Sequence, residues 1–370
     1  MSIQSDLKDR QLTTQIQTIV EKQYDVGPLT CIREIFGGFI NRSYAVWIDQ
    51  QGRSKKFFLR EYNPGIAESE IRFEHALLNH LRQNGLDIVS GVIPCRDGST
   101  FIKTSAQGRK ATFWGLFEFL EGDDPYTWDK TDLTDAEFIS AATILARLHH
   151  AGRDFIKPGG ADRAQPRIME FIPTFKSTFS GYALQAGDRR CDKLFMANKD
   201  RIFSVIDSCM AADKNCDGML EVPVHCDYHP GNLKYKNEKG VGIFDFDWSK
   251  IDYRVFDVAL SLVYFTSEWN GPAAGSLRMD KFLLFLKSYN EQCIRLDGIE
   301  PLTQKEQENF LPMLAAGNLY VLNWDLMDYY ETENLDDDEY YTYIEHNILL
   351  MHWIEAHSAD ISQIIQNRSQ

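Results

Sequence analysis

The residues best suited to chemistry lie in two short segments, residues 225–232 and 244–246. Asp227 offers a carboxylate that can accept the proton of a nucleophile, while Asn232 and Asp245 offer oxygen ligands of the kind that hold Mg²⁺. His225, the other candidate catalytic residue, is expected to brace its loop rather than to touch a substrate. A base beside metal ligands is what phosphoryl transfer requires.

The spacing His-x-Asp-x-x-x-x-Asn, with Asp-Phe further along, is that of a kinase catalytic loop and its metal-binding aspartate. A polar turn with incidental acids could produce such a triplet, but supporting parts lie upstream. Residues 36–44 contain Gly37 and Gly38, whose backbone N–H groups could face nucleotide phosphates, with Asn41 and Ser43 beside them. The alternative is a structural Gly-Gly hairpin.

A phosphate-gripping cation is expected on the strand at 57–62, where kinases carry a lysine. This chain has Arg60 there, and arginine binds phosphate in a different geometry from lysine. Lys56 lies earlier on the same face and is the poorer candidate. Glu74, on the helix that follows, is the expected ion-pair partner of Arg60. Glu70 competes for that role.

The segment 116–122 is expected to connect two lobes and to bind the adenine edge through backbone groups. The Glu118 carbonyl and the Leu120 amide are the candidates for these two contacts. The alternative is a plain edge strand that enters a loop.

The elements that must position these groups change character along the chain. Strands are expected at 31–36, 44–48, 57–62, 100–104 and 111–119, with one helix at 67–81. Beyond the break at 121–125 the pattern is mainly helical, with an acidic linker at 331–339. The predicted fold class is α+β, with a small antiparallel β lobe at 1–120 and a larger helical lobe at 121–370.

Composition narrows the functional classes. The chain has 370 residues and a formal charge of −15, which favours two lobes and disfavours nucleic acid as a partner. The 7 scattered cysteines predict free thiols in a reducing cytoplasm. No run of about 18 apolar residues is present, so no membrane span is expected.

Residues 30–265 resemble the aminoglycoside phosphotransferase and choline kinase superfamily. The resemblance rests on the glycine turn, Leu59-Arg60, Glu74, residues 117–122, 145–149 and 225–232, Asp245-Phe246 and residues 256–259. It implies a bilobal protein-kinase-like fold, dependence on ATP and Mg²⁺, and transfer of the γ-phosphoryl group to a small-molecule hydroxyl. The glycine turn and residues 244–249 look most like the type II homoserine kinase branch.

By position, Asp227 resembles the family's catalytic base, Asn232 and Asp245 its metal ligands, and Asp257 a helix-start acid that orders the catalytic loop. Two departures are Cys226, where the superfamily usually has glycine, and Arg60 in place of lysine. They leave open an alternative, a pseudokinase or nucleotide-binding regulatory module without turnover. A protein kinase is disfavoured because the segment between Asp245 and the next helix is short.

The acceptor is expected to bind in the helical lobe, where aromatic and acidic side chains gather along 318–330. After the acidic segment, Tyr340, Tyr341, His346 and Trp353 extend this set. Aromatic faces beside carboxylates can hold an ammonium group, at about 0.5–2 kcal/mol per aromatic contact. The alternative is ordinary helix packing. Partners are therefore ATP and a small-molecule hydroxyl compound, for a monomer or homodimer. The candidate acceptor residues are Asp247, Trp248, Trp324, Asp325 and Asp328.

Overall fold

A computed structural model describes residues 3–7, 9–36, 41–105, 110–213 and 216–366. The chain divides into two compact units. The first comprises Met1–Gly122, Phe155–Ala164 and Val241–Phe244, and the second comprises Asp123–Asp154, Gln165–Gly240 and Asp245–Gln370. The expected boundary at 120 lies close to the end of the first segment. The two short later segments of the first unit were not foreseen.

A six-stranded sheet forms the centre of the first unit, in the order β1-β2-β3-β4-β6-β5. Only the β1–β2 pair is parallel among these strands. The antiparallel β-rich lobe is thereby confirmed. The strands are β1 (Gln4–Ser5), β2 (Leu29–Ile35), β3 (Arg42–Gln50), β4 (Arg53–Glu61), β5 (Ile102–Thr104) and β6 (Thr112–Glu118).

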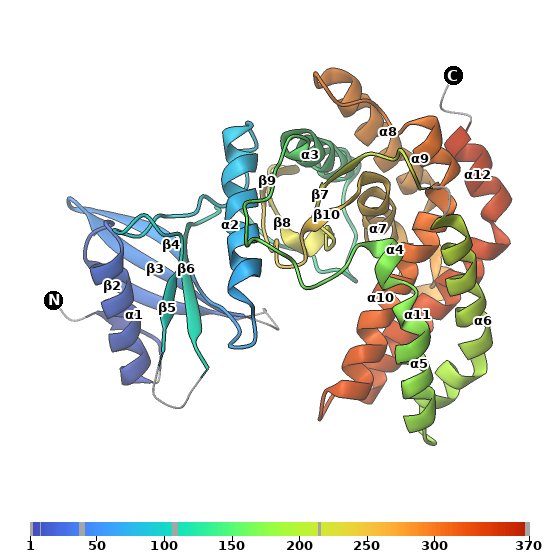
Figure 1. Cartoon of the computed structure of the whole chain (residues 1–370), viewed down its shortest axis with the longest axis horizontal. Helices are drawn as coiled ribbons and strands as arrows, with labels where there is room; N and C mark the ends of the chain where they lie inside the picture. Colours follow the sequence, from blue (N-terminus) through green and yellow to red (C-terminus); the bar gives the residue numbers. More distant parts are fainter. Residues whose placement is uncertain (1–2, 8, 37–40, 106–109, 214–215, 367–370) are drawn as a thin grey trace. The chain divides into compact units, whose positions relative to one another are not determined.

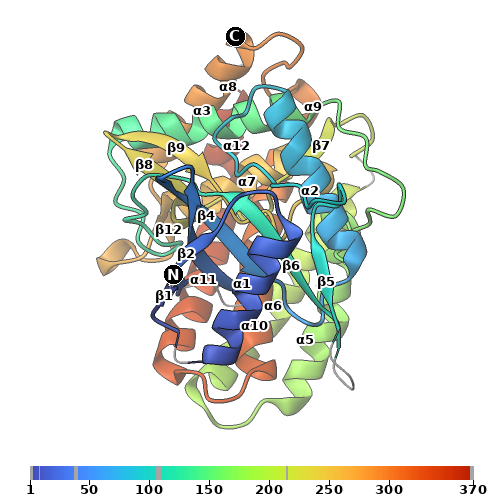
Figure 2. The ribbon, with the colours of Figure 1, turned by 90° about the vertical axis from the view of Figure 1, so that its left-hand side faces the viewer.

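Helix α1 (Arg10–Gln23) packs against this sheet and was not predicted (Figures 1 and 2). Asp9 caps its first turn by accepting hydrogen bonds from the Gln11 and Leu12 amides. Its buried residues, Ile16, Ile19 and Val20, join the core of the sheet. Apolar residues recur at 12, 16, 19 and 20, which is helical spacing, and Asp9 precedes them as a cap, so the sequence did contain the signal for this helix.

Helix α2 (Glu68–Gln83) confirms the helix expected at 67–81. Two polar residues on its inner side, Glu74 and His75, are buried together with its apolar positions. The His75 ring meets Phe117 of β6 edge-on, with 5.2 Å between ring centroids. Phe73 packs edge-on against Phe155, which belongs to one of the later segments of this unit. Helix α2 therefore places the buried Glu74 carboxylate beside Arg60 of β4.

The second unit is mainly helical, as predicted, and the predicted α+β fold class is confirmed. Helices α5, α6, α10 and α11 run side by side (Figure 1). The helices are α3 (Asp135–Gly152), α4 (Ile168–Phe171), α5 (Thr174–Gln185), α6 (Arg190–Asp213), α7 (Arg254–Thr266), α8 (Met279–Arg295), α9 (Gln304–Glu308), α10 (Phe310–Glu331), α11 (Asp337–Ala356) and α12 (Ser358–Gln366).

Short strands complete the second unit. Strands β7 (Glu221–Val224) and β10 (Lys250–Tyr253) pair antiparallel, as do β11 (Ser267–Glu268) and β12 (Ser276–Leu277). Strand β8 (Leu233–Lys236) precedes β9 (Lys239–Ile243), whose last residues belong to the first unit. Residues 225–232 fill the connection between β7 and β8. The expected catalytic loop is therefore fixed at both ends by strands.

Other expectations concern thiols, membranes and the acidic segment. All seven cysteines lie among the described residues, and no disulfide joins any two of them. No helix within the described ranges is long and apolar enough to cross a membrane. The acidic segment at 331–339 contains the connection between α10 and α11, and its last acids form the first turn of α11. Acids at that end of a helix complement the helix dipole.

A fully buried ion pair joins α7 to α9 in the second unit. Arg254 Nε donates to Glu306 Oε1 at 3.0 Å, and a second guanidinium nitrogen also donates to this carboxylate. Arg254 Nη1 donates to the Glu300 carbonyl at 2.7 Å. Both charged side chains have an exposure of 0%. Removal of one charge would leave the other in a medium that solvates it poorly.

Glu306→Gln is therefore expected to lower the free energy of unfolding by about 3 kcal/mol, since it leaves a buried guanidinium without its counter-charge. Urea denaturation followed by circular dichroism measures the change. The matched control is Glu308→Gln on the exposed side of the same helix, expected to stay within about 0.5 kcal/mol of the parent. Equal effects of the two variants would contradict the prediction.

Candidate active site

Asp227 lies at the centre of the loop between β7 and β8. Asn232 Nδ2 donates to the Asp227 carboxylate at 3.0 Å and to its backbone carbonyl at 2.9 Å. His229 Nε2 lies 3.6 Å from Asp227 Oδ2. The Asp227 side chain is 23% exposed, so a small solute can reach it. The Asn232 amide nitrogen is thus engaged within the loop, which leaves its oxygen for another ligand.

The charge state of Asp227 follows from its neighbours. Burial raises the pKa of this carboxyl, but His229 first, and then His225 and the Asn232 amide, favour its ionised form. The net effect holds the pKa of Asp227 below its ordinary value. The group is therefore an ionised hydrogen-bond acceptor at neutral pH.

Asp257, in the first turn of α7, holds the loop from behind. Its carboxylate accepts hydrogen bonds from the backbone amides of His225 and Cys226, both at 2.9 Å, and it lies 3.0 Å from His149 Nε2. The other His149 ring nitrogen lies 2.8 Å from the Tyr289 hydroxyl. Because all three side chains are buried, they form a fixed chain of hydrogen bonds behind the loop.

The protonation of this chain is set by the same contacts. Burial lowers the pKa of the His149 imidazole, which is therefore neutral. Burial raises the pKa of Asp257, but the His149 contact and the His225 amide outweigh it and hold that pKa below its ordinary value. His149 Nε2 accordingly donates to an ionised Asp257, and the Tyr289 hydroxyl donates to His149 Nδ1. The expected role of Asp257 in ordering the loop agrees with this geometry.

Cys226, the departure noted in the loop, has a backbone φ of 62°. This left-handed conformation costs a residue other than glycine about 1–2 kcal/mol. Its side chain is fully buried. The hydrogen bond from its amide to Asp257 stabilises the conformation, so the position retains a glycine-like backbone without a glycine.

Asp245 follows the end of β9 and also has a left-handed backbone, with φ of 65°. The next residue, Phe246, packs its ring against His225, with 4.7 Å between centroids. The Ser249 hydroxyl donates to the His225 carbonyl at 3.4 Å. His225 therefore braces the loop through its backbone and its ring packing. The segment that carries Asp245 lies against the catalytic loop.

In the first unit, Arg60 and Glu74 form the ion pair expected from the sequence, with 3.0 Å between Arg60 Nη1 and Glu74 Oε1. Their side chains are only 10% and 5% exposed. The Tyr62 hydroxyl donates to the other Glu74 oxygen at 2.9 Å. Glu70 instead approaches Arg163, at 3.8 Å.

The remaining nucleotide candidates of the first unit are only partly described. Gly37 and Gly38 lie outside the described residues. The Asn41 side chain accepts a hydrogen bond from the Asn63 amide at 2.9 Å, and Ser43 pairs with Arg60 across the β3–β4 ladder. Their roles toward a nucleotide stay predictions.

Glu118 ends β6, and Leu120 follows in the connecting segment. The Glu118 backbone carbonyl accepts a hydrogen bond from Ser90 Oγ at 3.3 Å, and its carboxylate lies 2.9 Å from Arg82. A carbonyl oxygen has two lone pairs, so a further contact through it is compatible with this bond. The adenine contacts of Glu118 and Leu120 stay predictions.

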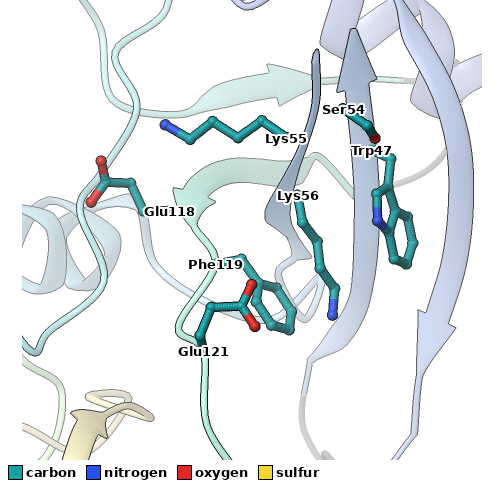
Figure 3. A pocket seen from close by; sticks show the side chains of 7 residues that line it. All are labelled: Trp47, Ser54, Lys55, Lys56, Glu118, Phe119 and Glu121. Atoms are coloured by element: carbon teal, nitrogen blue, oxygen red, sulfur yellow. The ribbon is translucent and has the colours of Figure 1, made fainter. Parts of the chain in front are cut away.

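A pocket opens beside this segment (Figure 3). Lys56, Phe119 and Glu121 lie together in it, whereas Lys55 extends to the other side of β4. The Lys56 ammonium lies 3.5 Å from the centroid of the Phe119 ring and 5.2 Å from that of Trp47. The pocket is lined by Trp47, Ser54, Lys55, Lys56, Glu118, Phe119 and Glu121.

The candidate acceptor residues lie in the second unit. Trp248 and Trp324 pack together, with 4.5 Å between ring centroids. Asp325 is buried and accepts a hydrogen bond from Asn347 at 2.7 Å, while burial raises its pKa to about 8. The half-buried Asp328 accepts a hydrogen bond from Tyr340 at 3.2 Å, and burial raises its pKa. Asp247 is partly exposed. Their roles toward an acceptor stay predictions.

Sequence reasoning missed several residues of this site. Tyr289 was not identified. His149 was noted as the end of a family motif, with a capping or packing role, but its contact with Asp257 was not foreseen because the two residues lie far apart in the chain. Tyr264 was also missed; its ring packs against His229 of the loop, with 5.4 Å between centroids, and burial, followed by the charge of Asp227, raises the pKa of its hydroxyl. His229 was the detectable one, because it lies within the loop itself.

The order of these groups along the chain agrees with a known family. A family model described as "Phosphotransferase enzyme family" matches residues 32–285. The chain belongs to the phosphotransferase enzyme family. The match confirms both the resemblance noted in the sequence and the predicted enzyme class, a phosphotransferase of the small-molecule kinase type.

Similar proteins include several homoserine kinases. The homoserine kinase of Ralstonia nicotianae is 25% identical over 302 residues, which cover 80% of each chain. That of Bradyrhizobium sp. strain BTAi1 is 27% identical over 296 residues, covering 80% of this chain and 78% of the other. The phosphotransferase therefore aligns with these relatives over most of its length.

Solved structures of low sequence identity confirm the protein-kinase-like fold. A microcompartment-associated aminopropanol kinase is 16% identical, with a TM-score of 0.66 and coverage of 95% of this chain and 98% of the other. An amicoumacin kinase in complex with AMP-PNP, Ca²⁺ and its ligand is 15% identical, with a TM-score of 0.63 and coverage of 97% and 94%.

The buried Asp325 gives the phosphotransferase a testable pH dependence. Its pKa is raised to about 8 in the folded chain, so the folded state keeps a proton that the unfolded state loses near its ordinary value of about 4. Because of this difference in bound protons, the free energy of unfolding is not reduced by Asp325 at low pH. It declines by at most about 1.4 kcal/mol per pH unit as the pH rises from about 4 toward 8.

Asp325→Asn should remove this decline, because the amide has no proton to lose. The variant should therefore gain stability relative to the parent between about pH 5 and pH 8, as measured by urea denaturation at each pH. Asp338→Asn, at an exposed position of α11, serves as the control. Parallel pH profiles of the parent and Asp325→Asn would refute the prediction.

Proposed function

We propose that this phosphotransferase moves the γ-phosphoryl group of ATP to a hydroxyl group of a small molecule, with Mg²⁺ as its metal. The observation that carries the proposal is the Asp227 carboxylate, which is ionised, partly exposed and held by Asn232 and His229. A fixed acceptor of this kind can align a hydroxyl group for in-line attack.

The reaction balances with the groups present. The hydroxyl oxygen of the acceptor forms a bond to the γ-phosphorus as the bond to the β–γ bridging oxygen breaks, and ADP leaves with the electron pair of that bond. The hydroxyl proton passes to Asp227. Asp257 serves this step at a distance, because it fixes the backbone of the loop that carries Asp227.

The donor set suits Mg²⁺. This ion prefers oxygen ligands and is often held by one or two carboxylates together with substrate phosphates. Asp245 would supply a carboxylate, and Asn232 would supply its amide oxygen, since its nitrogen is engaged with Asp227. The bound ion would neutralise charge on the phosphates. Among the described residues no group of three His, Cys, Asp or Glu side chains could hold a metal unaided.

The nucleotide would be bound by residues of the first unit. Arg60 is the cation proposed for the phosphates, and its buried pair with Glu74 fixes the position of the guanidinium. An arginine binds phosphate through a planar fork rather than a point charge, so the geometry differs from that of a lysine. A related structure with AMP-PNP supports ATP as the phosphoryl donor.

The acceptor class we propose is a small amine-bearing alcohol. Homoserine kinases and an aminopropanol kinase are among the similar proteins, and both names denote amino alcohols. The acidic and aromatic side chains around Asp325 and Trp324 fit an ammonium group better than an anion. The panel that tests the acceptor includes L-homoserine, 3-aminopropan-1-ol, choline, ethanolamine, methylthioribose and aminoglycosides.

Asp227→Asn is expected to lower ADP release in the presence of an acceptor by at least about a hundredfold, because the general base is lost. A coupled assay of ADP release over the acceptor panel measures it. ATP binding, followed by thermal shift with Mg²⁺, should persist because the residue lies outside the first unit. Asp217→Asn, at an exposed turn, is the control and should keep full activity.

Full turnover by Asp227→Asn would sink the proposal. Binding of ATP by the parent without turnover of any acceptor would favour the alternative, a pseudokinase or nucleotide-binding regulatory module. The two departures, Arg60 and Cys226, motivate that alternative. The intact set of Asp227, Asn232 and Asp245 favours the enzyme.

A further inference from the structure

A second aromatic cluster lies in the second unit, distinct from the packed pair of Trp248 and Trp324. It consists of Trp128, Trp269, Tyr343 and His346. Trp128 meets Trp269 at 4.9 Å and Tyr343 at 4.5 Å between ring centroids. The His346 imidazole stacks face to face on Trp269, at 3.6 Å and an interplanar angle of 9°. The Trp128, Trp269 and Tyr343 rings remain partly exposed, so the cluster is open to solutes.

His346 is the unexplained member of this cluster. Its side chain is buried, at 5% exposure, yet neither ring nitrogen has a hydrogen-bond partner among the described residues. Burial lowers the pKa of the imidazole to about 3, so the ring is neutral and presents one donor and one acceptor. An unsatisfied buried polar group costs about 1–3 kcal/mol, and native proteins rarely leave one without a reason.

Two further polar atoms near His346 are in the same situation. Trp269 Nε1 and Asn318 Oδ1 are buried and have no partner within the described part of the chain. Asn318 is linked to the cluster because its amide nitrogen donates to the carbonyl of Asn347, the neighbour of His346, at 2.9 Å. The Asn347 side chain in turn donates to Asp325. Donors, acceptors and a carboxylic acid thus gather beside the aromatic faces.

Tyr264 connects this cluster to the catalytic loop. Tyr264 lies on α7, which packs against α10, the helix that carries Asp325. The Tyr264 ring also packs against His229, at 5.4 Å between centroids. A small molecule that places a hydroxyl group at Asp227 can therefore extend toward Asp325.

We propose that Trp128, Trp269, Tyr343 and His346, with Asp325, form the subsite that holds the amine end of the acceptor. The acceptor would be a small primary amino alcohol. This inference rests on the proposed function, because it assumes that the hydroxyl end of the acceptor lies at Asp227.

The chemistry of the subsite favours an ammonium group over a neutral or anionic one. The faces of tryptophan and tyrosine rings attract cations, and this attraction increases away from water. The unpaired nitrogen of a neutral His346 can accept a hydrogen bond from an ammonium N–H. Asp325 ionises more readily beside a cation, which supplies the counter-charge. An anionic ligand would instead meet an acid and the negative faces of the rings.

Two acceptors that differ only at the far end test the subsite. 3-Aminopropan-1-ol and propane-1,3-diol have the same chain length and one terminal hydroxyl in common. At the other end the first carries an ammonium group and the second carries a hydroxyl group. The measured quantity is the ratio of kcat/KM for the amine to that for the diol, from ADP release. His346→Phe retains the stacked ring but removes both nitrogens, and is expected to lower this ratio about tenfold through KM for the amine.

The chain offers a matched control. His357 also stacks on a tryptophan, Trp353, with 4.2 Å between centroids, but its Nδ1 is hydrogen-bonded to the Trp353 carbonyl at 2.9 Å. His357→Phe should leave the ratio unchanged. Asp325→Asn, as a second variant, should also lower the preference for the amine while KM for ATP stays the same. An unchanged ratio in both His346→Phe and Asp325→Asn overturns the proposal.

A direct binding measurement separates this proposal from the proposed function. Tryptophan fluorescence of the parent, titrated with 3-aminopropan-1-ol and with L-homoserine, should change saturably and less so in His346→Phe. Such binding without ADP release would contradict the proposed function while it supports the subsite. No saturable change with either amine overturns the subsite itself.

Discussion

The carboxylate of Asp257 accepts hydrogen bonds from two successive backbone amides, and the shape of the catalytic loop depends on this arrangement. His149 keeps the carboxylate ionised, and Tyr289 fixes which nitrogen of His149 carries the proton. The three residues come from different helices, α7, α3 and α8. These contacts anchor the backbone of the catalytic loop to the helical core behind it. The position of Asp227 therefore depends on residues that lie behind the loop.

Charged groups are buried in both units, but in different ways. Arg60 and Glu74 form a pair that is nearly excluded from water, and Tyr62 satisfies the second carboxylate oxygen. Arg254 and Glu306 are fully buried in the second unit and join two helices. Buried pairs of this kind add little net stability, but the loss of one partner is severely destabilising. They fix the relative positions of elements more than they strengthen the fold.

Local patterns were sufficient for some elements and not for others. Strands β3 and β4, helix α2 and the pairing of Arg60 with Glu74 were predictable because short-range periodicity and the order of motifs determine them. Helix α1 was predictable in the same way, from its apolar residues at 12, 16, 19 and 20 and the Asp9 cap, but it was overlooked. The contacts of His149 and Tyr289 with Asp257, and the orphaned nitrogens of His346, arise from packing between segments distant in sequence, which no spacing along the chain records.

The left-handed backbone at Cys226 has an evolutionary consequence. The Asp257 carboxylate binds the backbone amide of this residue, so a cysteine and a glycine can share the same loop shape, the cysteine at a small cost in free energy. A cysteine codon and a glycine codon differ by a single base. The residue can therefore drift between the two without an intermediate that loses the loop, and selection at this position acts on how well the side chain fills its buried space. Asp257 binds the backbone amide whether the residue is cysteine or glycine, so the loop shape depends on Asp257 in either case.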